Sequence, residues 1–182
     1  KYEKLGLTTY GPVPNKRQME WYRREGTIFF HFGMNTFTDK EWGDGTESPS
    51  LFNPTELNVR QWIKTIKDAG FECAILTVKH HDGFCLWDSQ YTRYSVASAT
   101  DWDVENRDIV ALLSEECKAQ GLKFGIAISP LDRREESYGS GEAYNTYFKN
   151  LLREVLTKYG DIFYVRFDGA AEPDKNGNVQ EY

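Results

Sequence analysis

The chain is 182 residues long, which suffices for one sizeable hydrophobic core. Its 28 acidic residues outnumber its 22 basic residues and give a net charge of −6, so we expect no nucleic-acid partner and no anionic membrane partner. The longest apolar runs have the length of a strand, far below the ~20 residues that a membrane-spanning helix needs. Cys73, Cys85 and Cys117 lack CxxC spacing and indicate neither a disulfide framework nor a zinc site.

Four short segments rich in β-branched and aromatic residues are predicted to form strands, because such side chains suit a pleated, packed surface. They cover residues 26–33, 73–80, 123–129 and 162–168. Helices are predicted at residues 15–24, 58–70, 107–121 and 144–159. In the second of these helices, Val59, Trp62 and Ile66 recur at the spacing of one helix face. Gly70 then follows the last turn, where glycine commonly ends a helix.

The predicted strands and helices alternate, with a long polar loop after each of the first three strands and a tight turn before the next. The strands are almost continuously apolar, as expected where both faces of a sheet are covered, and right-handed crossovers then make the sheet parallel. Long loops at the carboxyl ends of the strands are typical of a (β/α)8 barrel of the TIM type, which takes about 250 residues. We therefore predict an α/β chain with about the first four β/α units of such a barrel, forming the N-terminal portion of one catalytic domain over residues 1–182.

All three histidines of the chain fall at the carboxyl end of a predicted strand. His31 lies near the end of the first strand, His80 and His81 lie at the end of the second, and Asp168 lies at the end of the fourth. One histidine at such a position usually has a structural role. Three histidines and a carboxylate on one rim predict a functional site, because ligands of parallel α/β proteins bind at the carboxyl ends of the strands.

Three reaction classes can use such a rim. A metal-dependent hydrolase needs convergent imidazoles and a carboxylate, but adjacent strand residues point to opposite faces, so we expect only one of His80 and His81 to face the site. A serine nucleophile would need a Gly-x-Ser-x-Gly elbow, which is absent, so Ser129 is interpreted as structural. Neutral histidines, aromatic residues and a strand-end carboxylate suit a sugar and attack at its anomeric carbon. The metal-dependent hydrolase stays open as an alternative.

Five short motifs follow one another along nearly the whole chain. They are Phe30-His31-Phe32-Gly33, Thr38-Asp39-Lys40-Glu41-Trp42-Gly43, Lys79-His80-His81-Asp82-Gly83-Phe84, Ser129-Pro130 and Phe167-Asp168-Gly169-Ala170. In this order, with the long loops between them, the motifs resemble the α-L-fucosidases of glycoside hydrolase family 29. The resemblance implies the N-terminal half of that family's catalytic barrel.

The resemblance implies an exo-acting, retaining α-L-fucosidase that removes terminal α-linked L-fucose through a glycosyl-enzyme intermediate. It implies Asp168 as the nucleophile. The residues that it implies for fucose binding are His31, Glu41, Trp42, His80 and His81. The implied partner is a fucosylated oligosaccharide or glycoconjugate, with no cofactor and no metal ion, in a secreted or periplasmic location.

Two positions depart from the family's pattern, since Leu131 and Arg166 stand where many relatives carry tryptophan. Both departures are expected to remove an aromatic wall from the sugar site. Arg166 shares a strand face with Asp168, so we expect it either to lower the pKa of that carboxylate or to pair with it and block it. The acid/base residue of the family is expected beyond Tyr182. The alternative is therefore a non-catalytic, truncated or engineered half-barrel that binds sugar or self-assembles through its open edges.

Overall fold

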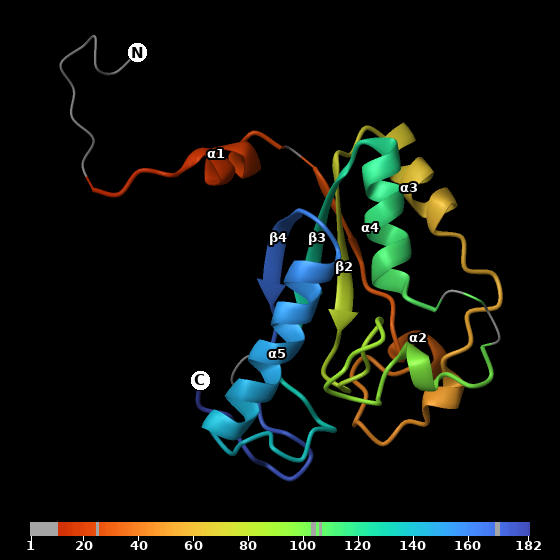
Figure 1. Cartoon of the computed structure of the whole chain (residues 1–182), viewed down its shortest axis with the longest axis vertical. Coiled ribbons are helices and arrows are strands. Elements are labelled where there is room, and N and C mark those ends of the chain that lie inside the picture. The colour runs from red at the N-terminus through yellow and green to blue at the C-terminus, as the bar shows by residue number, and fades with distance from the viewer. Residues whose placement is uncertain (1–10, 25, 103–104, 106, 170–171) are drawn as a thin grey trace.

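The structure is a computed structural model that describes residues 11–24, 26–102, 105, 107–169 and 172–182. Its main elements are α1 (Lys16–Tyr22), β1 (Thr27–Phe30), α2 (Asn35–Thr38), α3 (Val59–Asp68), β2 (Cys73–Lys79), α4 (Ile109–Gln120), β3 (Lys123–Ile128), α5 (Glu142–Lys158) and β4 (Ile162–Phe167) (Figure 1). Two 3₁₀ turns, Pro49–Leu51 and Val96–Ser98, lie in the loops after β1 and β2. Among the described helices, none combines the length and the apolar character needed to cross a bilayer.

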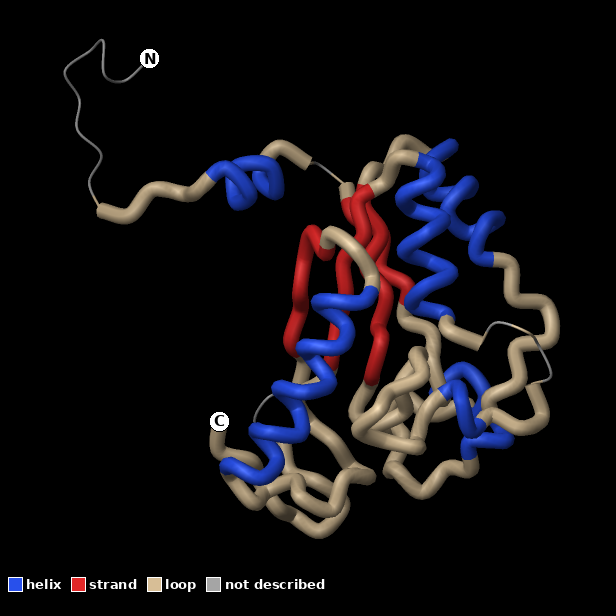
Figure 2. Tube along the Cα trace, viewed as in Figure 1, coloured by secondary structure: helices blue, strands red, loops and turns tan. Residues whose placement is uncertain are grey.

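The four strands form one parallel sheet in the order β1-β2-β3-β4. Figure 2 shows them side by side, with the long loops gathered beyond their carboxyl ends. A doubly wound sheet reverses its strand order at a switch point, whereas here each strand pairs with the next one along the chain. This order is that of half a (β/α)8 barrel. The predicted α/β class with four β/α units is therefore confirmed.

The hydrophobic core lies between the sheet and helices α3, α4 and α5. Alternate residues of a strand point to the same face of a sheet, and on β2 these are Ala74, Leu76 and Val78. They share one buried cluster with residues of the three helices, among them Ile63, Leu113 and Leu151. All three long helices therefore cover the same face of the sheet.

The other face of the sheet is less covered at its two edge strands. Phe29 of β1 is 40% exposed, and the guanidinium of Arg166 on β4 lies 5.6 Å from its ring centroid. Trp21 of α1 stacks on Tyr164 of β4, with 4.4 Å between the ring centroids. The expectation that both faces of every strand are covered is thus wrong at the edge strands, since Phe29 of β1 and Arg166 and Phe167 of β4 have exposed side chains.

Most predicted boundaries agree with the structure, and local chemistry explains them. Asn15 caps α1 by accepting a hydrogen bond from the Gln18 amide at 3.0 Å, and Gly121 ends α4 in the left-handed conformation with φ 79°. The first strand is shorter than predicted and ends at Phe30. Its apolar run continues to Phe32, but that ring leaves the sheet and packs 5.3 Å from the Trp62 ring centroid.

Candidate active site

The site lies where β1, β2 and β4 end. One ligand-capable atom each of His80, His81 and Asp168 lies within 4.8 Å of the other two. The ring of His31 meets that of His80 edge to face, with 4.6 Å between the centroids. The structure therefore brings together the three histidines and the carboxylate that the sequence places on one rim.

The two adjacent histidines face the same site. Their ring centroids are 4.0 Å apart and the ring planes differ by 32°, so the prediction that only one of them faces the site is wrong. The pairing register of β2 with β3 shifts between Thr77 and Lys79, and the chain then turns, with the Gly83 amide donating to the His80 carbonyl at 3.1 Å. Strand alternation no longer applies beyond such a bulge and turn.

Both of these histidines are neutral at physiological pH. Burial is the main reason that the pKa of His80 falls from 6.5 to about 3, and the neighbouring His81 lowers it further. Burial likewise lowers the pKa of His81 to about 4, although the carboxylate of Asp168 acts in the opposite direction. A neutral imidazole offers one hydrogen-bond donor and one acceptor, which matches the needs of a hydroxyl group.

Asp168 is accessible at the end of the fourth strand. Its Oδ1 lies 3.8 Å from Nη2 of Arg166, and the two side chains are 50% and 52% exposed. The predicted pairing with Arg166 is therefore present, but an ion pair this exposed contributes only about 0–1 kcal/mol. Such a pair leaves the carboxylate free to meet a ligand.

Leu131 is fully buried and belongs to the hydrophobic core. The loss of an aromatic wall at this position stays a prediction. Arg166, the second departure from the family's pattern, lies beside Asp168.

Trp42 reaches the site from the loop after β1. Its ring meets that of His81 edge to face at 5.0 Å, and the guanidinium of Arg133 lies 5.2 Å from the Trp42 ring centroid. Glu41 is exposed, and its backbone carbonyl accepts a hydrogen bond from Nδ2 of Asn35 at 2.7 Å. Among the hydrogen bonds, ion pairs and ring contacts of the described residues, Trp42 touches His81, whereas the Glu41 carboxylate touches none of the histidines.

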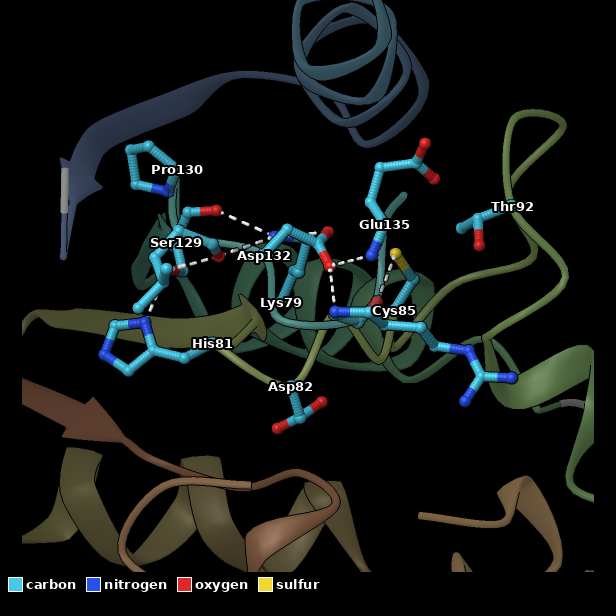
Figure 3. A network of polar contacts seen from close by, with 12 residues as sticks. Lys79, His81, Asp82, Cys85, Thr92, Ser129, Pro130, Asp132 and Glu135 are labelled. Atoms are coloured by element: carbon cyan, nitrogen blue, oxygen red, sulfur yellow. Dashed lines mark hydrogen bonds and ion pairs between the residues drawn. The ribbon is translucent and has the colours of Figure 1, made fainter. Parts of the chain in front are cut away.

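A buried ion pair between Lys79 and Asp132 lies beside Ser129 and His81 (Figure 3). Nζ of Lys79 lies 3.0 Å from Oδ2 of Asp132, and both side chains are almost completely buried. The same ammonium donates to the carbonyls of Ser129 at 2.9 Å and Leu131 at 3.2 Å. These contacts fix the end of β2 to the loop after β3. The sequence pattern alone predicts no specific role for Lys79 or Asp132.

Two motif glycines allow the loops to approach one another closely. Gly83 has φ +88°, and a Cβ at this position would lie 2.6 Å from Oδ1 of Asp132. Gly169 has φ +70°, and a Cβ there would lie 2.5 Å from Cε1 of His81. Only glycine meets both the backbone and the space requirement. These glycines explain the Asp-Gly pairs in the second and fourth β/α connections.

Ser129, interpreted from the sequence as structural, contacts two residues of the site. Its hydroxyl lies 2.6 Å from Nδ1 of His81, and it also contacts the backbone carbonyl of Asp168 at 3.0 Å. The available signal was its position at the carboxyl end of β3, between the strands that carry those two residues. Thr77 was also missed, and its Oγ1 lies 3.1 Å from Nδ1 of His31.

Two imidazoles and a carboxylate can also ligate zinc, so this cluster is also a candidate metal centre. In a tetrahedral zinc site the ligand atoms are about 3.4 Å apart, given bonds of about 2.1 Å, and here the three ligand atoms lie within 4.8 Å of one another. In addition, Ser129 engages Nδ1 of His81, and Arg166 pairs with Asp168. These two contacts favour a site that exchanges hydrogen bonds with a ligand, and the metal-dependent hydrolase remains the alternative.

Comparison with known proteins places these features in one family. The family model for α-L-fucosidase matches residues 3–181. α-L-Fucosidase 1 of Arabidopsis thaliana is 49% identical over 159 residues, which cover 87% of this chain and 31% of that protein. A glycoside hydrolase 29 family member from an unknown rumen bacterium has a solved structure with a TM-score of 0.84 and 45% identity, covering 94% of this chain and 31% of that one.

A further solved structure is that of a GH29 fucosidase from Ruminococcus gnavus in complex with fucose. It is 37% identical with a TM-score of 0.82, and the match covers 96% of this chain and 40% of that one. The present chain thus spans about a third of the length of the curated relatives it matches. Because the family model covers almost every residue, the chain belongs to the α-L-fucosidase family.

Proposed function

We propose that this chain forms the N-terminal half of the catalytic barrel of an exo-acting, retaining α-L-fucosidase, which releases terminal α-linked L-fucose from glycans. The observation that carries the proposal is the convergence of His80, His81 and Asp168 within 4.8 Å at the carboxyl ends of β2 and β4. A relative of similar fold was solved with fucose bound, which supports a fucosylated oligosaccharide or glycoconjugate as the partner.

In this proposal the histidines bind the hydroxyl groups of fucose. His80 and His81 are neutral and His31 is exposed beside them, so the three rings can exchange hydrogen bonds with neighbouring hydroxyls. Trp42, which is 42% exposed, offers an apolar surface to the C–H face or the methyl group of the sugar. Glu41 lies next to it in the loop and is assigned a hydrogen bond to a hydroxyl at the rim.

Asp168 acts as the nucleophile. Its carboxylate oxygen forms a bond to the anomeric carbon while the glycosidic C–O bond breaks, and the leaving oxygen takes a proton from an acid. Water then attacks the resulting glycosyl ester, so the configuration of the anomeric carbon is retained. A second carboxyl group about 5–5.5 Å from the nucleophile must supply and recover the proton. We assign that role to no residue of this chain.

The test uses aryl α-L-fucosides with good and poor leaving groups. A nitrophenolate departs without a proton, so the chain is expected to turn over a nitrophenyl fucoside slowly and a methylphenyl fucoside much more slowly. Asp168→Ala should abolish the reaction. Asp161→Ala is the matched control, because Asp161 lies at the opposite end of β4 and is an exposed carboxylate paired with Arg17.

Two results would contradict the proposal. Equal activity of Asp168→Ala and the parent would remove the assigned nucleophile. Binding of L-fucose without turnover of either substrate would instead support the non-catalytic half-barrel. Dialysis against a chelator distinguishes the fucosidase from a metal-dependent hydrolase, since only the metal-dependent enzyme would lose activity.

A further inference from the structure

Ser129 occupies the centre of the site without belonging to the set that binds or attacks the sugar. It follows the last residue of β3, which lies between β2 and β4 in the sheet. Its hydroxyl oxygen lies 2.6 Å from Nδ1 of His81, 2.9 Å from the Leu131 carbonyl and 3.0 Å from the Asp168 carbonyl. Figure 3 shows the contact between Ser129 and His81 as a dashed line, and Ser129 is buried.

The single hydrogen of the Ser129 hydroxyl limits which of these contacts can be donated by the serine. A serine hydroxyl carries one hydrogen, and a backbone carbonyl can only accept. If Ser129 donated to His81, two carbonyl oxygens would face its lone pairs at 2.9 and 3.0 Å with no hydrogen between them. If Nδ1 of His81 carries a proton and donates to Ser129, the serine hydrogen is free for a carbonyl.

The choice between the two carbonyls follows from a neighbouring donor. Nζ of Lys79 already donates to the Leu131 carbonyl at 3.2 Å. The Asp168 carbonyl is therefore the favoured acceptor for the hydroxyl of Ser129. One serine thus accepts from the ring at the end of β2 and donates to the backbone at the end of β4.

We propose that Ser129 is a positioning residue that holds His81 in the tautomer protonated on Nδ1, with Nε2 left as a hydrogen-bond acceptor for the ligand. Burial supports a neutral ring, since it lowers the pKa of His81 to about 4. The ring cannot easily rotate to another arrangement, because Gly169 and Trp42 lie against it. Ser129 is itself 1% exposed, so water does not readily replace its hydroxyl.

The tautomer determines which ligand groups the site accepts. An unprotonated Nε2 requires a donor, as does the carboxylate of Asp168. A hydroxyl group fits this pair, whereas a methyl ether, a carbonyl or a carboxylate would bring an acceptor against an acceptor. The site therefore selects a neutral ligand with free hydroxyls. This consequence rests on the proposed fucose site, while the tautomer itself does not.

The tautomer can be read directly by nuclear magnetic resonance of the full chain with ¹⁵N-labelled histidine. The chain has three histidines, so substitution of His31 or His80 by glutamine suffices to assign the signals. The parent is expected to show a protonated Nδ1 and an unprotonated Nε2 for His81. Ser129→Ala should shift His81 toward the tautomer protonated on Nε2, and Ser129→Thr, which keeps a hydroxyl, should restore the parent pattern.

Ser89→Ala is the matched control, because Ser89 is also buried and its hydroxyl donates to Glu154 at 2.7 Å, away from the histidines. It should leave the His81 signals unchanged. A parent His81 protonated on Nε2, or an unchanged tautomer in Ser129→Ala, would overturn the proposal. If Ser129→Ala does not fold, the parent spectrum and Ser129→Thr still decide.

Calorimetric titration with L-fucose then tests the consequence for the ligand. Ser129→Ala is expected to bind L-fucose about tenfold more weakly than the parent, the effect of losing about 1.4 kcal/mol, and Ser129→Thr should retain parent affinity. Equal affinity in Ser129→Ala would overturn the positioning role. If the parent itself fails to bind L-fucose, the proposed function fails and the spectroscopic result for His81 stands independently.

Discussion

At the scale of single residues, the site depends on a close fit around His81. The ring is in contact with Ser129 through Nδ1, with Trp42 across its edge, and with the backbone of Gly169. A neighbour at van der Waals distance on each of these sides leaves the ring little freedom. Small changes next to His81 should therefore affect ligand binding more than they affect the stability of the fold.

Gly169→Ala tests this fit. The added Cβ would lie 2.5 Å from Cε1 of His81, so the ring must move. Gly160→Ala is the control, because Gly160 has a similar φ of +76° but no atom within 4 Å of the added Cβ. Both variants should lose about 1 kcal/mol through backbone strain. Only Gly169→Ala should lose L-fucose affinity in calorimetry; equal affinities in the two variants would contradict the predicted fit.

The pH dependence of stability tests the neutral histidines. The pKa of His81 is about 4 in the folded chain and 6.5 ordinarily. Between pH 6.5 and pH 4, therefore, His81 binds a proton in the unfolded chain but not in the folded chain. Stability should therefore fall as the pH drops from 6.5 toward 4, and His81→Gln should reduce the loss between pH 7 and pH 5 by about 2 kcal/mol.

Asp82 provides a control, because its titration changes stability in the direction opposite to that of His81. Burial raises the folded pKa of Asp82 to about 6 from 3.8, so the folded chain gains a proton there that the unfolded chain does not. Asp82→Asn should therefore make the loss of stability on acidification steeper. Urea denaturation at several pH values measures both effects. Parallel curves for the parent and His81→Gln would contradict the neutral assignment.

At the scale of elements, the sequence predicts the alternation of strands and helices well, because side-chain periodicity and caps are local properties. The second strand was predicted at 73–80 and is Cys73–Lys79. The failures lie where the chain leaves regular structure. The shared orientation of His80 and His81 depends on a register shift and a turn. The contacts of Ser129 join residues at the ends of three different strands. No local sequence pattern predicts either feature.

A buried carboxylate on α5 fixes the loop after β2 to the helix layer. Glu154 accepts hydrogen bonds from Nε1 of Trp87 at 3.0 Å, the hydroxyl of Ser89 at 2.7 Å and the Gln90 amide at 3.0 Å. Glu154→Ala would leave these donors without their acceptor, and we expect a loss of about 3 kcal/mol in the free energy of unfolding.

Glu142→Ala is the control on the same helix. Glu142 pairs with Lys149 at 3.5 Å, and both side chains are mostly exposed, so its loss should change stability by no more than about 0.5 kcal/mol. Urea denaturation gives both values. A difference between the two variants of less than about 1 kcal/mol would show that Glu154 does not anchor the loop.

In the whole molecule, the part of the chain that the structure describes forms a sheet with two unpaired edges. Within it, β1 pairs only with β2 and β4 pairs only with β3, and Phe29 on β1 is 40% exposed. Unpaired edges and exposed apolar side chains favour association with another sheet. We therefore propose that the isolated chain self-associates through this open side, which would bring two half-barrels together.

Sedimentation velocity over a range of concentrations tests the association. The parent should form a larger species as its concentration rises, and Phe29→Lys should shift the equilibrium toward the monomer. Leu51→Lys is the control, because Leu51 is 48% exposed but lies in the loop after β1 and outside the sheet. Identical behaviour of the parent and Phe29→Lys would contradict association through this face.

The proposed attack of Asp168 on the anomeric carbon of L-fucose forms a covalent glycosyl ester. A 2-deoxy-2-fluoro-fucosyl fluoride tests it most directly, because fluoride leaves without an acid and the fluorine at C2 slows hydrolysis of the ester. After incubation of the full chain and proteolysis, mass spectrometry should find one fluorofucosyl adduct on the peptide that contains Asp168, and none in Asp168→Ala. An adduct on a different carboxylate, or no adduct in the parent, would contradict the account.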